Sequence, residues 1–144
     1  MARTILLVGT IVWLLVGAGG LAVAVFGADR LLSLLPPLAI DAEALGGALL
    51  TVAIALLLVG VAHAIVVAGL RRGLRWARSA GALLGAVLAI ASIALAAAAL
   101  SSAIRETAVA PVLLVAGSAA TLAALGYGLV AVRLARELTS GSAN

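Results

Sequence analysis

The sequence predicts an all-α polytopic membrane protein, a four-transmembrane-helix bundle with both chain ends inside. Three observations lead to this prediction. Of the 144 residues, 66% are hydrophobic and only 10% are charged, whereas soluble domains are about 45–50% apolar and about 25% charged. The apolar residues gather in four uncharged stretches, and most arginines lie at one set of their ends. A globule of this size cannot hide so much apolar surface, so the excess must face lipid.

Each of the four stretches exceeds the about 20 residues that a helix needs to cross about 30 Å of hydrocarbon. They cover residues 4–28, 44–70, 79–104 and 107–132. Inside lipid every backbone N–H and C=O must be paired internally, which favours helices. We therefore expect a single transmembrane domain over residues 1–144. Its connections are an outer loop at 29–43, a basic inner loop at 71–78 and an inner tail at 133–144.

The arginines predict the orientation. With the N-terminus inside, seven of the nine arginines lie on the inner side, and only Arg30 and Arg105 lie outside. Short loops rich in arginine face the cytoplasm, so both termini are expected there. Nine arginines without a lysine favour a GC-rich bacterial source and hence the plasma (inner) membrane. Alternatively, residues 4–28 are a cleaved signal peptide, but their apolar run exceeds the usual 7–15 residues.

The sequence contains little that could perform catalysis. It has no cysteine and one histidine, His63, which excludes disulfides, thiolate-bound zinc and a two-histidine metal site. We expect no catalytic residue, no metal and no enzyme activity. The sequence pI of about 11.5 indicates an anionic partner. Because the arginines flank apolar stretches, this partner is expected to be lipid headgroups, with no nucleic acid.

His63 lies near the middle of the second stretch. An ionisable group at that depth is costly and suggests a function, such as contact with haem or quinone. The simpler interpretation is a neutral imidazole bonded to a backbone carbonyl or to a hydroxyl such as Thr121 or Ser92. No Asp, Glu, Lys or Arg occurs within the stretches, which argues against an ion-coupled transporter. The span hydroxyls are expected to bond back to their own helices.

Small residues recur at every fourth position in three of the stretches, and such rows let helices approach closely in lipid. The rows are Gly60, Ala64 and Ala68; Gly81, Gly85 and Ala89; and Ala116, Ala120, Ala124 and Gly128. We interpret them as packing surfaces within the bundle. The alternative is an interface with a second copy or with another membrane subunit.

Seven residues near the inner ends are expected to anchor the chain to lipid headgroups. They are Arg71, Arg72, Arg75, Trp76, Arg78, Arg133 and Arg136. Each arginine near an anionic leaflet contributes about 1 kcal/mol to membrane attraction, and tryptophan favours the headgroup level. Tyr127 is expected to act as a further interfacial anchor.

These observations favour a non-catalytic integral membrane protein. It would be an accessory or assembly subunit of a larger membrane complex, or a self-associating helical bundle. Two alternatives remain open. One is a small transporter or permeation pathway lined by His63 and the span hydroxyls, and the other is a haem- or quinone-binding membrane anchor that uses His63.

Overall fold

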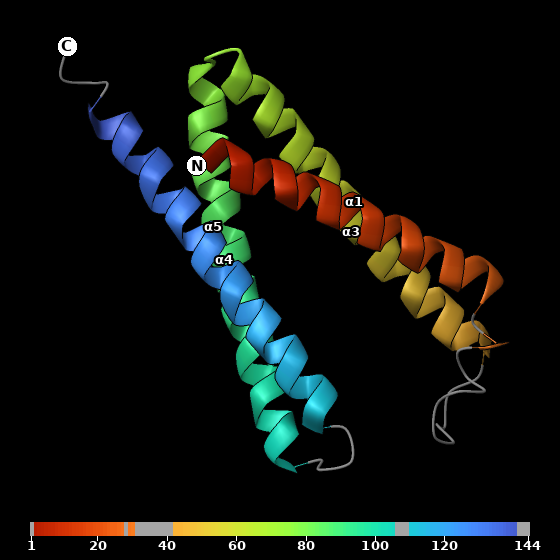
Figure 1. Cartoon of the computed structure of the whole chain (residues 1–144). Coiled ribbons are helices and arrows are strands. Elements are labelled where there is room, and N and C mark those ends of the chain that lie inside the picture. The colour runs from red at the N-terminus through yellow and green to blue at the C-terminus, as the bar shows by residue number, and fades with distance from the viewer. Residues whose placement is uncertain (1, 28, 31–41, 106–109, 141–144) are drawn as a thin grey trace. The chain divides into compact units, whose positions relative to one another are not determined.

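The computed structural model describes residues 2–27, 29–30, 42–105 and 110–140, and it is all-α as the sequence predicts (Figure 1). Its long helices are α1 (Ala2–Phe26), α3 (Ala42–Arg71), α4 (Arg75–Arg105) and α5 (Ala110–Ser140). Each of these four helices is long and apolar enough to cross a membrane. No more than 28% of the residues in the most apolar part of any of them are buried. Most of their apolar side chains therefore face outward.

Two helices extend further than the uncharged stretches. α4 begins at Arg75 rather than at residue 79, and α5 continues to Ser140 rather than ending at residue 132. Both contain 31 residues, which span about 46 Å at 1.5 Å per residue. An uncharged stretch marks only the part of a helix that fits the hydrocarbon. Beyond it, Arg133 Nε and Glu137 Oε1 lie 3.7 Å apart, a pairing that supports a helix in water.

The connection between α3 and α4 is much shorter than the basic loop expected at 71–78. Only residues 72–74 lie outside the two helices. Gly73 has a φ of +71°, its N–H donates to Leu70 O at 3.3 Å, and the Leu74 N–H donates to Gly69 O at 3.0 Å. These are the two bonds of a Schellman helix end, which favours glycine at the left-handed position. Arg75 therefore belongs to a helix rather than to a loop.

The remaining connections fall largely outside the described residues, which omit 31–41 of the outer loop, 106–109, and 141–144 of the tail. Glu43 lies in the first turn of α3, where the helix dipole favours a carboxylate. Pro111 is the second residue of α5, a position that tolerates proline because the missing N–H has no helical partner there.

The chain divides into two compact units, where the sequence predicts one domain. The first is Leu6–Ile65, which holds most of α1 and α3. The second joins Met1–Ile5 to Val66–Asn144 and contains α4 and α5. In the Leu6–Ile65 unit, α1 and α3 lie side by side (Figure 1). In the other unit, α4 and α5 pack on one another.

Candidate functional site

α1 and α3 meet through reciprocal contacts between glycine and leucine. A Cβ atom on Gly17 would lie 2.8 Å from Leu57 Cγ, and one on Gly60 would lie 2.8 Å from Leu14 Cγ. Each leucine thus occupies space that only a glycine leaves open. The pairing is antiparallel, and Gly20 continues it, with a Cβ position 3.3 Å from Ala53 Cβ. No row with a step of four predicts the α1 contribution, although three glycines lie within four residues there.

α4 buries only small residues. Its buried residues are Ala77, Gly81, Gly85, Ala89, Ala96, Ala99 and Ala103. A Cβ atom on Gly85 would lie 2.9 Å from Tyr127 O and 3.1 Å from Ala131 N, so the backbones of α4 and α5 touch at this point. Close backbone approach of this kind is what holds helices together in lipid, where no hydrophobic drive exists between them.

The three predicted rows of small residues differ in how many of their members are buried. All of Gly81, Gly85 and Ala89 are buried. In the other two rows only some members are: Gly60 in α3, and Ala120 and Ala124 in α5. Ala64 and Gly128 are half-buried, while Ala68 and Ala116 are exposed. A row with a constant step of four turns by about 40° per step around a helix with 3.6 residues per turn, so it leaves the contact face.

The buried face of α5 instead mixes steps of three and four. Its residues are Gly117, Ala120, Ala124, Tyr127, Val130 and Leu134. Tyr127 is only 5% exposed, which corrects its expected role as an interfacial anchor. Its side chain is packed inside the unit because the three-residue step from Ala124 brings it onto the α4-facing side.

His63 is fully buried in α3, on the same face as Gly60 and Val67. Its Nδ1 lies 2.8 Å from Val59 O. Because a carbonyl only accepts, Nδ1 carries the proton and donates. The bond to a backbone carbonyl agrees with the simpler interpretation of this residue. Within the described ranges, no group of three or more His, Cys, Asp or Glu residues could hold a metal ion.

Three span hydroxyls also bond back to their own helices, as expected. The Oγ1 atoms donate to the carbonyl four residues earlier: Thr10 to Leu6 at 2.9 Å, Thr51 to Gly47 at 2.9 Å, and Thr121 to Gly117 at 2.8 Å. A hydroxyl that is satisfied in this way does not need a partner on another helix.

The residues expected at the headgroups are mostly exposed. Arg71, Arg72, Arg75, Trp76, Arg133 and Arg136 are exposed, and Arg78 is half-buried. Trp76 also packs against the turn, since a Cβ atom on Gly69 would lie 3.0 Å from Trp76 Cζ2 and 2.6 Å from Ala77 Cβ. The Gly69 position therefore has to stay without a side chain for the turn to close beside Trp76.

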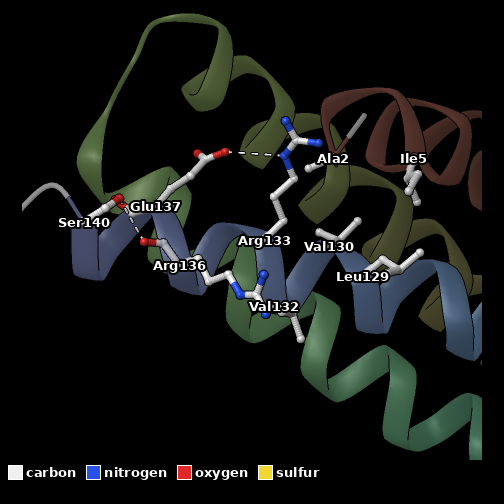
Figure 2. A pocket seen from close by; sticks show the side chains of 9 residues that line it. All are labelled: Ala2, Ile5, Leu129, Val130, Val132, Arg133, Arg136, Glu137 and Ser140. Atoms are coloured by element: carbon white, nitrogen blue, oxygen red, sulfur yellow. Dashed lines mark hydrogen bonds and ion pairs between the residues drawn. The ribbon is translucent and has the colours of Figure 1, made fainter.

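Two pockets lie in the unit that joins Met1–Ile5 to Val66–Asn144. The larger, about 570 Å³, lies between the first residues of α1 and the second half of α5, with Ala2 and Ile5 across from Leu129 and Val130 (Figure 2). The smaller, about 240 Å³, is lined by Arg3, Arg78, Arg133 and Glu137 among others. Ala2, Arg133 and Glu137 line both pockets. The sequence does not predict that Arg3 lies near Arg78 and Arg133, because the three come from three helices.

The described residues therefore define an all-α protein with four candidate membrane spans, which suggests a multi-pass membrane protein. Comparison of the chain with protein-family models, curated proteins and solved structures gives no significant match.

Proposed function

We propose that this chain is a non-catalytic integral membrane protein that works by lateral helix association, either with a second copy of itself or with another subunit of a membrane complex. The observation that carries the proposal is a second row of small residues on α4. Ala91, Ala94, Ala98 and Ser101 are all exposed. They follow one another in steps of three, four and three, which keeps them on one face of a helix.

This exposed face lies roughly opposite the small residues that α4 buries, given 100° per residue. α4 thus has small residues on two sides, and α5 covers only one of them. The Ser101 hydroxyl donates to Ala98 O at 2.9 Å, so this face presents few unmet polar groups. In lipid, small side chains favour helix pairing because they permit close backbone contact. A helix face that meets only lipid does not need small side chains.

Arginine placement supports an orientation with both termini in the cytoplasm. Arg3 at the start of α1, Arg78 at the start of α4 and Arg133 toward the end of α5 line one pocket. These three helix ends therefore lie at one level, as an excess of arginine on the inner side requires. We place this level at the cytoplasmic surface of the plasma membrane.

Size measurement of the full chain in mild detergent, or in native nanodiscs, tests the proposal. We expect the wild-type chain to run as an oligomer or with other subunits. The double variant Ala94→Leu/Ala98→Leu should dissociate, because two isobutyl groups separate the backbones. The matched control Ala55→Leu/Ala119→Leu adds the same groups at exposed alanines of α3 and α5 and should not. A wild-type chain that is monomeric and alone in both media would overturn the proposal.

A further inference from the structure

Three arginines from three helices line one small pocket. Arg3 comes from α1, Arg78 from the first turn of α4, and Arg133 from α5. With a volume of about 240 Å³, the pocket has room for about eight waters at about 30 Å³ each. Among the described residues that line it, Glu137 is the one acidic residue, so three arginines against one carboxylate leave two net positive charges there. The pocket therefore favours an anion.

Only one of these arginines is engaged by an acidic group. Arg133 Nε lies 3.7 Å from Glu137 Oε1, and the two side chains are 56% and 46% exposed, so this pair is weak. Within the part of the chain that the structure describes, Arg3 and Arg78 form no ion pair. A guanidinium presents several donors in a plane, which suits the oxygens of a phosphate ester.

The basic pocket adjoins a second, larger pocket. The larger pocket of about 570 Å³ shares Ala2, Arg133 and Glu137 with it. Away from that shared edge, the larger pocket is lined mainly by aliphatic side chains such as Ile5 and Leu129 (Figure 2). A small cationic space that shares one edge with a larger space of mainly aliphatic lining suits a molecule with a phosphate at one end and a hydrocarbon chain at the other.

We propose that the two pockets together bind one anionic phospholipid. Its phosphate lies among Arg3, Arg78 and Arg133, and one acyl chain runs along Ile5 and Leu129. This inference rests on the proposed function, which puts these helix ends at the headgroup level of the cytoplasmic leaflet. Basic pockets between transmembrane helices on that side are known to recognise anionic headgroups. Soluble phosphates share the phosphate chemistry, but they have no use for the apolar pocket.

Native mass spectrometry of the full chain tests the site with two probes of equal acyl chains, phosphatidylglycerol and phosphatidylcholine. We expect one phosphatidylglycerol to stay bound in preference to phosphatidylcholine. Arg3→Gln/Arg78→Gln should weaken this binding about a hundredfold, because each arginine gives up a charge-assisted hydrogen bond to the phosphate. The control Arg71→Gln/Arg75→Gln removes the same charge from two exposed residues that flank the α3–α4 turn and line neither pocket. It should change binding less than about threefold, because diffuse attraction to a leaflet is screened.

Equal weakening by the two double variants would overturn the proposal, because it would show general attraction to charge rather than a site. Leu129→Trp adds bulk at an exposed lining residue and should weaken lipid binding. If Leu129→Trp has no effect and inorganic phosphate displaces the lipid at equal concentration, the site takes soluble phosphate, and the lipid assignment is overturned.

Release of the chain from membranes by alkaline carbonate would overturn the proposed function as well. A membrane-retained chain without lipid preference overturns only this inference.

Discussion

Gly60 of α3 faces the side chain of Leu14 of α1, and the fit leaves no room for a methyl group. A Cβ atom on Gly60 would lie 2.8 Å from both Cγ and Cδ2 of Leu14 and 3.1 Å from its backbone N. Gly17 and Leu57 repeat this arrangement with the helices exchanged. Each helix of the pair therefore gives one glycine and receives one leucine, and these two contacts fix the register between the helices.

A double-mutant cycle measures the energetic coupling between Gly60 and Leu14. Gly60→Ala should destabilise the α1–α3 pair by about 1–3 kcal/mol, the usual range for overpacking. Leu14→Ala removes the Cγ and Cδ2 atoms that the new methyl group would meet. In the presence of Leu14→Ala, Gly60→Ala should cost less than it does alone, because the two residues are in contact. Additive changes in the free energy of unfolding, measured by titration with sodium dodecyl sulfate in mixed micelles, would contradict the contact.

Gly85→Ala should separate α4 from α5. The added methyl group would meet backbone atoms, Tyr127 O at 2.9 Å and Ala131 N at 3.1 Å, and backbone cannot rotate away as a side chain does. We expect a loss of about 1–3 kcal/mol in the free energy of unfolding. Gly128→Ala in α5 is the matched control, since nothing lies within 4 Å of its Cβ position. Its effect should stay within about 0.5 kcal/mol.

Gly73→Ala should weaken the turn between α3 and α4. A left-handed backbone costs an L-residue about 1–2 kcal/mol, and Gly73 has a φ of +71° with open space around its Cβ position. The cost is therefore conformational rather than steric. Gly73→Asn should recover part of the loss, because asparagine tolerates this conformation better than alanine does. Equal melting temperatures for the two variants would argue against the helix end described above.

His63→Leu should leave folding and association intact. The substitution keeps the buried volume filled, and it removes a hydrogen bond to Val59 O within the same helix. Polar contacts in membrane proteins contribute about 0.6 kcal/mol on average, so the change in the free energy of unfolding should be of that size. We expect the absorption spectrum of the purified wild-type protein to contain no haem band, and the spectrum of His63→Leu to match it. Loss of such a band, or loss of solute flux in liposomes, would favour the haem-anchor or permeation interpretation.

The absence of native cysteine makes the orientation easy to measure. A single cysteine introduced by Thr139→Cys should be labelled by a membrane-impermeant maleimide only after the cytoplasmic side is opened. Ser33→Cys, in the expected outer loop, should be labelled in intact cells. The reverse pattern would show that the arginine-rich ends face outward and would contradict the positive-inside interpretation.

The number of helices and their chemical class could be predicted from the sequence because each depends on a long uncharged run. The helix ends could not. Arg78 and Arg133 carry charges that bound a hydrophobic stretch, yet both lie within helices. A charge marks where the hydrocarbon stops, whereas a helix stops where its backbone is capped, as it is at Gly73.

The contacts were predictable only in part. The row at Gly81 and Gly85 is buried throughout, but Ala68 and Ala116 are exposed, because a fixed step of four drifts around a helix. The α1 glycines opposite Leu57 and Ala53 were not identified, since which helix faces which is a tertiary property. The same reason hides the pocket at Arg3, because the two other arginines that line it lie 75 and 130 positions away in the sequence.

The buried side of α4 has a consequence for how the protein tolerates change. Every buried residue there is alanine or glycine, so almost no atom can be deleted, and random substitution can only enlarge a side chain. A saturation scan of this side should be one-sided: exchanges between glycine, alanine and serine survive at the roomier positions, and every bulkier residue fails. Ordinary cores fail mostly through voids, whereas this one should fail through crowding.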